Sequence, residues 1–150
     1  MVALAGCGGA PVEKSDWERK HEQALQALPE PPLSVPPYAP RGELLEFSLG
    51  PTSSFRYFID ASSLSVAEGI VRYVLVARSA EGVENVSYEG MRCASGEVRI
   101  YAVGRAGGWS GAPGAWRNPL AWHRALYREY FCRFKQPIRS REEGIAALRR

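Results

Sequence analysis

One stretch of the chain holds three consecutive segments with the composition of β-strands. Residues 69–78 (GIVRYVLVAR) are β-branched, aromatic and almost continuously apolar. Residues 85–93 and 96–104 alternate apolar with polar side chains, and only short turns separate the three segments. Because parallel strands need a long crossover between them, these short connections predict an antiparallel meander. Residues 55–60 (FRYFID) are a further candidate, so we expect an antiparallel sheet of about four strands.

The hydrophobic period changes from that of a strand to that of a helix near Pro119. Residues 118–134 (NPLAWHRALYREYFCRF) predict the main helix, with Asn118 as its N-cap and Pro119 at the first helical position. The apolar side chains near one face of this helix are Leu120, Tyr127, Tyr130, Phe131 and Phe134. The fold class that follows is α+β, with the antiparallel sheet packed against the C-terminal helix.

Two shorter segments are also typical of helices. Residues 140–148 begin with the pattern of a capping box, in which the side chains of Ser140 and Glu143 accept hydrogen bonds from backbone amides of the first turn. Residues 13–28 carry a partial apolar stripe, and this N-terminal helix should end before Pro29.

A proline-rich segment follows the N-terminal helix. Residues 29–40 (PEPPLSVPPYAP) contain six of the chain's eleven prolines. Because proline cannot continue a helix or donate to a β-ladder, the segment predicts an extended, polyproline-like connector that separates the helix from the domain. The chain then divides into a truncated signal and tether (1–12), an N-terminal helix (13–28), a Pro-rich linker (29–40) and a single domain (41–150).

The first residues carry the pattern of an export signal. Residues 4–7 (LAGC) read as the processing site of a bacterial lipoprotein, at which Cys7 becomes lipid-modified. Only six residues precede Cys7 and none is Lys or Arg, whereas a signal peptide has a basic region and an apolar core. We therefore expect the reading frame to extend upstream of Met1. The alternative is a cytoplasmic protein whose small-residue tail happens to contain Cys7.

The cysteines bear on the compartment. Apart from Cys7 there are Cys93 and Cys132, and no C-x-x-C is present, which excludes thioredoxin-like chemistry and c-type haem attachment. The simplest prediction is one disulfide between Cys93 and Cys132, formed in an oxidising periplasm. Two buried free thiols are the alternative. We expect no metal and no cofactor.

Positive charge is concentrated at the C-terminal end. The whole chain has a formal net charge of +3, whereas residues 117–150 hold nine bases and three acids. Arg-rich surfaces form bidentate contacts with phosphates and carboxylates. An envelope protein or an anionic envelope component is therefore a candidate partner, and an ordinary solvated face is the alternative. We expect no nucleic-acid partner, no transmembrane helix, and membrane attachment only through a lipid anchor at Cys7.

Strings in the strand and helix regions occur together in an order that resembles the CNP1-like family of bacterial proteins. The residues that carry the resemblance are Ser63, Leu64, Ser65, Val66, Val71, Arg72, Tyr73, Arg78, Ser79, Asn85, Val86, Ser87, Tyr88, Glu89, Gly90, Arg92, Cys93, Tyr101, His123, Leu126, Tyr127, Tyr130 and Phe131. The resemblance covers about residues 40–148. It implies a periplasmic, lipoprotein-like protein whose biochemical activity is unknown, and it supplies no active site.

Six residues are candidates for a ligand site. Tyr88, Glu89 and Arg92 form a polar set beside Cys93, although Glu89 could instead pair with a cross-strand Arg. Trp109 and Trp116 lie in a Gly-rich loop, where they either stack on a ligand or fold back as a lid over the core. His123 is the sixth candidate. It could act as a general base, or it could simply make a hydrogen bond on the helix face.

These observations lead to two hypotheses from different classes. The first is a non-enzymatic envelope lipoprotein that binds an unidentified partner or ligand. The alternative is a small periplasmic hydrolase that uses His123 with Glu89 or Asp60. The two differ in whether the His123 imidazole and a carboxylate converge in an open pocket, and no catalytic residue is assigned from the sequence.

Overall fold

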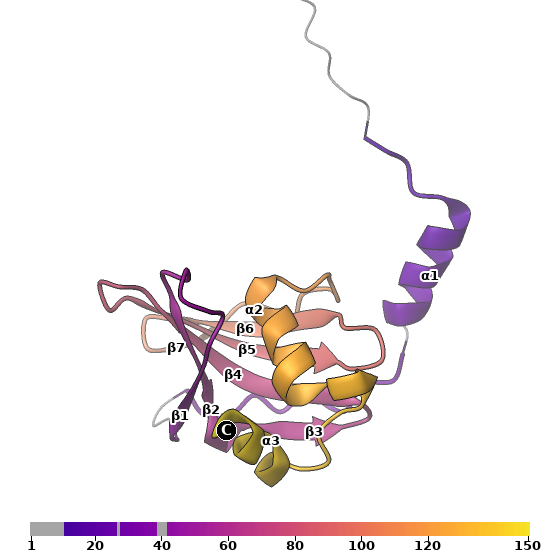
Figure 1. Cartoon of the computed structure of the whole chain (residues 1–150). Helices are drawn as coiled ribbons and strands as arrows, with labels where there is room; N and C mark the ends of the chain where they lie inside the picture. The colour runs from indigo at the N-terminus through magenta and orange to yellow at the C-terminus, as the bar shows by residue number, and fades with distance from the viewer. Residues whose placement is uncertain (1–10, 27, 39–41) are drawn as a thin grey trace, which may run out of the picture.

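A computed structural model describes residues 11–26, 28–38 and 42–150 and has the expected α+β class (Figure 1). Within this part of the chain one antiparallel sheet has seven strands, so the expectation of about four was too low. Its strands are β1 (Leu44–Phe47), β2 (Arg56–Asp60), β3 (Ser65–Ala67), β4 (Ile70–Arg78), β5 (Glu84–Arg92), β6 (Val98–Arg105) and β7 (Gly108–Ser110). Their order is β1-β2-β4-β5-β6-β7, and β3 pairs with β4.

The central strand β4 shares one of its edges between two partners. β2 pairs with its C-terminal half and β3 with its N-terminal half, and the short 3₁₀ turn η1 (Ala61–Ser63) joins the two. The amide of Val74 lies between these two ladders and donates instead to Oγ of Ser63, at 2.7 Å. A hydroxyl therefore completes the hydrogen bonding of the buried strand where no neighbouring backbone is available.

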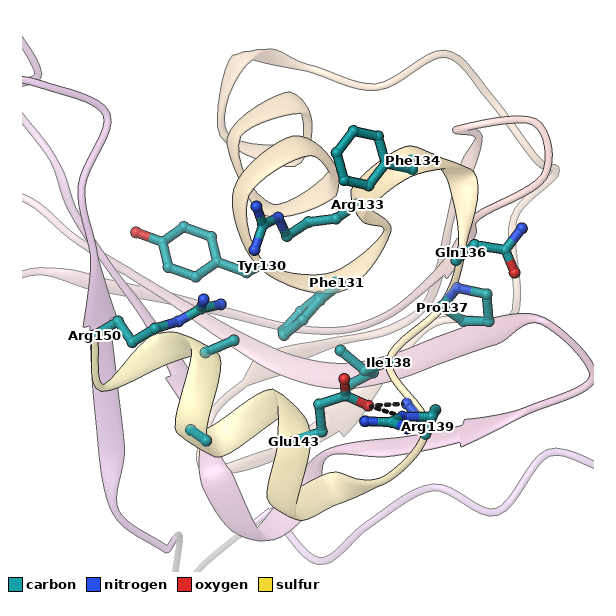
Figure 2. A pocket seen from close by; sticks show the side chains of 12 residues that line it. Tyr130, Phe131, Arg133, Phe134, Gln136, Pro137, Ile138, Arg139, Glu143 and Arg150 are labelled. Carbon is teal, nitrogen blue, oxygen red and sulfur yellow. Dashed lines mark hydrogen bonds and ion pairs between the residues drawn. The ribbon is translucent and has the colours of Figure 1, made fainter.

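The C-terminal helices cover one face of the sheet (Figure 1). They are α2 (Ala121–Ala125), which continues into the π-helical turn η2 (Leu126–Phe131), the short turn η3 (Arg133–Lys135) and α3 (Arg141–Leu148). In Figure 2, η2 and η3 lie on one side of a groove and α3 lies on the other. Leu126, Phe131 and Leu148 are buried against the sheet face that carries Tyr73 and Met91.

The main helix begins later than the sequence indicated. Its N-cap is Leu120 rather than Asn118, because Nδ1 of His123 accepts the backbone amide of Leu120 at 3.1 Å and so satisfies the first turn. Leu120 and Phe134 were expected on the apolar face, yet both are exposed. At α3, Oγ of Ser140 accepts the amide of Glu143 as expected, whereas the Glu143 carboxylate bonds the amide of Arg139.

The proline-rich segment lies across the opposite face of the sheet. Residues 29–38, called the strap below, follow α1 (Asp16–Gln26) and pass behind the sheet in Figure 1. Strand residues of that face, among them Val74, Val76, Val86 and Tyr88, form a second buried cluster on which Tyr38 packs. The segment has no helix or strand, as expected of an extended connector, and in addition it packs on the sheet. Both faces of β4 are covered, which explains why its sequence is almost continuously apolar.

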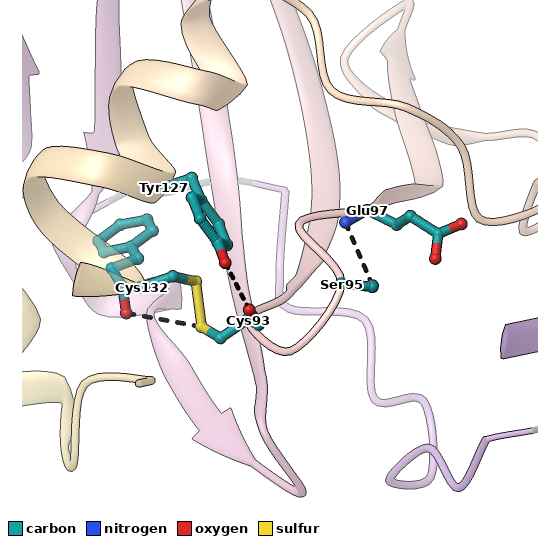
Figure 3. Close-up of a disulfide and its surroundings, with 6 residues drawn as sticks. Cys93, Ser95, Glu97, Tyr127 and Cys132 are labelled. Atoms are coloured by element: carbon teal, nitrogen blue, oxygen red, sulfur yellow. Dashed lines mark hydrogen bonds between the residues drawn. A yellow bond between two sulfur atoms is a disulfide. The ribbon is translucent and has the colours of Figure 1, made fainter. Parts of the chain in front are cut away.

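A disulfide ties the helical layer to the sheet (Figure 3). Cys93 directly follows β5 and Cys132 directly follows η2, and their Cα atoms lie 5.1 Å apart. The hydroxyl of Tyr127 donates to the carbonyl of Cys93 at 2.6 Å and makes a second link between the same elements. The pairing predicted from the sequence is confirmed.

Candidate functional site

Glu89 and His123 form a buried pair between the sheet and α2. Nε2 of His123 lies 2.8 Å from Oε2 of Glu89, and the side chains are only 1% and 3% exposed. Glu89 also accepts the hydroxyl of Ser87 at 2.8 Å and that of Tyr73 at 3.3 Å. The carboxylate thus has three donors, which offsets the cost of removing it from water.

The hydrogen bonds of His123 define its tautomer. Because Nδ1 accepts the amide of Leu120, the ring proton is on Nε2 and is donated to Glu89. Burial, followed by the charge of Glu89, holds the pKa of Tyr73 well above its ordinary value, so the phenol remains a donor. Both nitrogens of the imidazole are therefore used inside the protein, and neither offers a lone pair to a substrate.

A groove of about 440 Å³ opens beside this pair on the helix-covered face of the sheet. We call it the sheet groove. Its apolar lining comes from Phe55 and from β2, β4, β5, β6 and α2. Its polar lining comes from Asn85 and Arg105 and from Ser87 and Glu89 on β5, which we call its floor. The residues that line it are Phe55, Tyr57, Leu75, Ala77, Asn85, Val86, Ser87, Glu89, Ile100, Val103, Gly104, Arg105 and Trp122.

Two aromatic rings form one wall of the sheet groove. Trp122 stacks on Tyr57 with ring centroids 5.5 Å apart and an interplanar angle of 18°. The indole Nε1 of Trp122 is buried and has no hydrogen-bond partner among the described residues. A buried donor without an acceptor is costly, so this wall has an unused polar group next to an apolar surface.

Asp60, the other carboxylate considered for His123, is used elsewhere. Its Oδ1 accepts the amide of Ser62 at 2.9 Å, the hydroxyl of Ser62 at 2.6 Å and the amide of Gly42 at 3.1 Å. It caps the turn η1, and no hydrogen bond joins it to His123 in the described part of the chain.

A cluster of charges on the strap-covered face was not anticipated. Glu30 of the strap pairs with Arg72 of β4 at 3.0 Å and with Arg99 of β6 at 2.6 Å, and it also accepts the hydroxyl of Tyr101. Arg72 further donates to the carbonyls of Pro31 and Pro32, at 2.7 and 2.9 Å. We call this cluster the Glu30 site. Its Arg72 side chain is only 7% exposed.

The Glu30 site shifts the protonation of its own members. Burial alone would raise the pKa of Glu30, but hydrogen bonds from Tyr101 and Arg72 and the charge of Arg99 outweigh it and hold the pKa below its usual value. Burial, reinforced by the hydrogen bond to Glu30, raises the pKa of Tyr101. The carboxylate therefore stays ionised and holds the strap on the sheet.

The remaining candidates also lie with the strap. The hydroxyl of Tyr88 donates to the carbonyl of Ser34 at 3.4 Å, and Nε1 of Trp109 donates to that of Pro36 at 2.7 Å. Trp109 stands on β7, in a segment expected to be loop, and packs edge-on against Tyr38.

Arg92 and Trp116 form the last pair of candidates. The guanidinium of Arg92 lies 4.1 Å from the ring centroid of Trp116, and both side chains are buried. Trp116 therefore folds back onto the protein. Glu89 and His123 contact each other directly on the helix side, and among the described residues Glu89 makes no ion pair with an arginine.

Three further predictions concern metal binding, membrane-spanning helices and lipidation. In the described ranges 11–26, 28–38 and 42–150, no three His, Cys, Asp or Glu side chains lie close enough together to hold a metal ion. No helix there is long and apolar enough to cross a membrane. Cys7 lies outside the described residues.

The comparison with protein families identifies the chain. The model of the CNP1-like family matches residues 13–149, and the protein therefore belongs to this family. The matched region contains α1 and the strap as well as the sheet. Searches of the curated proteins and of the solved structures found no significant match.

Proposed function

We propose that this protein is a non-enzymatic binding protein of the bacterial cell envelope and that it holds a small apolar ligand in the sheet groove. The observation that carries the proposal is the composition of that groove. Its walls are aromatic and aliphatic, and a few polar groups converge on its floor, which is the usual make-up of a small-molecule site.

The geometry of His123 argues for binding rather than hydrolysis. A general base needs a free lone pair within reach of the proton that it removes. Both nitrogens of His123 are bonded within the protein, the residue is fully buried, and it does not line the sheet groove. The pair with Glu89 supports the groove floor and supplies no open base for a hydrolase.

The floor of the groove indicates the class of ligand. The half-buried hydroxyl of Ser87 donates its proton to Glu89 and keeps lone pairs on its oxygen, so a ligand with one N–H or O–H donor would find an acceptor there. Tyr57 and Trp122 provide flat apolar surface for the rest of the molecule. An aromatic or aliphatic molecule with a single polar donor satisfies both conditions.

The envelope location rests on two independent features. The disulfide between Cys93 and Cys132 is of a kind that persists in oxidising compartments and is rare in the cytosol. The sequence LAGC at residues 4–7 matches a lipoprotein processing site. We propose a periplasmic protein that is anchored to the outer membrane by lipid at Cys7. Mass spectrometry of the native protein tests this, and an unmodified Met1 would contradict it.

The sheet groove can be tested with N-phenyl-1-naphthylamine, an apolar aromatic probe that has one N–H donor and fluoresces in apolar surroundings. We expect saturable enhancement at one site on the oxidised protein. Ala77→Trp should abolish it, because the larger ring fills the groove. Val83→Trp is the matched control, since Val83 lies exposed in the turn between β4 and β5 and does not line the groove.

Two outcomes would overturn the binding proposal. One is the absence of saturable enhancement in the native protein. The other is enhancement that Ala77→Trp and Val83→Trp change equally. Thermal melts of both variants accompany the titration, so that loss of the fold is not read as loss of the site.

A further inference from the structure

Among the described residues that follow α1, Phe134 is the most exposed large apolar side chain. It is 90% exposed, although it stands only two residues after the disulfide cysteine at the end of η2. Its neighbours Arg133 and Lys135 are exposed as well. An aromatic ring in water between two bases loses the free energy that burial would provide. Exposed apolar surface of this kind often marks an interaction site.

The backbone at this position enforces the exposure. Phe134 and Lys135 both have left-handed dihedrals, with φ of 55° and 61°. Non-glycine residues adopt this region at a cost, and two in succession require the surroundings to impose it. The amides of Lys135 and Gln136 are bonded to the carbonyls of Cys132 and Arg133, at 2.9 and 3.0 Å, so the turn is closed and presents Phe134 outward.

A groove of about 700 Å³ lies next to Phe134, between η3 and α3. Figure 2 shows Phe134 and Arg133 on one side of it and Glu143 with Arg139 on the other. Its apolar lining includes Tyr130, Pro137, Ile138 and Ala146, and three arginines line it: Arg133, Arg139 and Arg150.

Basic side chains around this groove outnumber the acidic ones, and one carboxylate is already paired. The carboxylate of Glu143 is bonded to Arg139 at 3.3 Å and to its backbone amide. No ion pair to Arg133, Lys135 or Arg150 is found in the part of the chain that the structure describes. These three bases therefore face solvent without an acidic partner, around one exposed aromatic ring.

We infer that this basic, Phe-tipped surface docks on an anionic phospholipid bilayer. Phe134 would enter the boundary between headgroups and acyl chains, where an aromatic ring regains its burial. Arg133, Lys135 and Arg150 would lie at the level of the lipid phosphates, with which arginine forms bidentate bonds. Charge complementarity selects this partner over a neutral bilayer. The surface is distinct from the sheet groove and would orient the domain on the membrane in addition to any lipid anchor.

Vesicle co-sedimentation tests the inference. The full oxidised chain with Cys7→Ala, which removes the anchoring residue, is mixed with vesicles of equal parts phosphatidylcholine and phosphatidylglycerol or of phosphatidylcholine alone. We expect binding to the anionic vesicles only, weakened by added salt. Phe134→Ser should weaken it about tenfold, and Arg133→Gln or Lys135→Gln about fivefold each.

Matched controls come from α1. Trp17 is an exposed aromatic residue at 70% and Lys20 an exposed base, so Trp17→Ser and Lys20→Gln change the same chemistry elsewhere and should leave binding unchanged. Equal binding to neutral vesicles, or undiminished binding of Phe134→Ser, would overturn the inference. So would self-association that is abolished by Phe134→Ser without any vesicle binding, which would assign the surface to a second copy. None of these outcomes affects probe binding in the sheet groove, which Phe134 does not line.

Discussion

Nε2 of His123 lies 2.8 Å from Oε2 of Glu89, and both side chains are shut off from solvent. The bond joins α2 to the middle of β5, and the two residues are 34 positions apart in the sequence. Because Nδ1 of the same ring accepts the amide of Leu120, one imidazole both starts the helix and binds it to the sheet. This is a structural role, and it has consequences for stability that a catalytic role would not have.

The first prediction concerns this pair. His123→Leu should lower the free energy of unfolding by about 1–3 kcal/mol, because it removes one of the three hydrogen bonds to the buried Glu89 side chain and the acceptor of the Leu120 amide. The double variant His123→Leu with Glu89→Leu should be more stable than the single one, since no buried charge remains. Urea denaturation of the oxidised protein measures both. A single variant that unfolds like the native protein would show that the pair does not stabilise the fold.

The second prediction concerns the strap. Glu30→Gln removes the charge that holds Arg72 and Arg99, so residues 29–38 should become sensitive to proteinase K. We expect a loss of about 1–3 kcal/mol, limited because the arginines regain water once the strap leaves. Glu81→Gln, in the exposed turn after β4, is the matched control. Mass spectrometry locates the cuts, and equal resistance of the two variants would contradict the prediction.

The third prediction is the pH dependence of the strap. The pKa of Glu30 is below its ordinary value of 4.5 in the folded protein, so its contribution is complete above that value and is lost as the pH falls through the lowered one. Proteolysis within residues 29–38 should therefore increase on acidification below about pH 4.5. In Glu30→Gln, which does not titrate, cleavage should be high throughout. A native strap that is equally protected at low pH would contradict this assignment.

The fourth prediction uses two glycines of the sheet. A Cβ on Gly90 would lie 2.8 Å from Cε2 of Tyr101, whose hydroxyl binds Glu30, whereas a Cβ on Gly108 would meet nothing within 4 Å. Gly90→Ala should destabilise the protein by about 1–3 kcal/mol through overpacking and should also loosen the strap. Gly108→Ala should change stability by less than about 0.5 kcal/mol. Thermal melts compare the two, and similar losses would argue against the close approach.

The long strands were predictable because each one carries its own signal. β4 and β6 are long enough for composition or alternation to indicate a strand, and their bounds differ from the predicted ones by one or two residues. β3 and β7 have three residues each, too few for a period of two to be recognised. They form only because the strand next to them offers a free edge, which is a tertiary effect.

The Glu30 site could likewise be predicted only in part from the sequence. Arg72 stands within an apolar strand, and such a charge indicates that a buried partner exists. The partner is 42 residues earlier in a segment whose prolines predict extended backbone but not the surface on which it lies. For His123 the sequence left a base and a satisfied hydrogen bond open, and the structure adds that both ring nitrogens are bonded, one to Glu89 and one to the amide of Leu120.

The last prediction concerns the disulfide between Cys93 and Cys132. The bond closes a loop across 39 residues and joins the end of β5 to the end of η2. In a Cys7→Ala background, Cys132→Ala should lower stability by about 2–4 kcal/mol, because the unfolded chain regains the entropy of the open loop. The melting temperature should fall by roughly 10 °C, and reductant should bring the parent protein to the same value. Probe binding in the sheet groove should survive below the melting transition, since neither cysteine lines it. Two titratable thiols in the folded, non-reduced parent would contradict the pairing and would also remove one of the two supports for an envelope location.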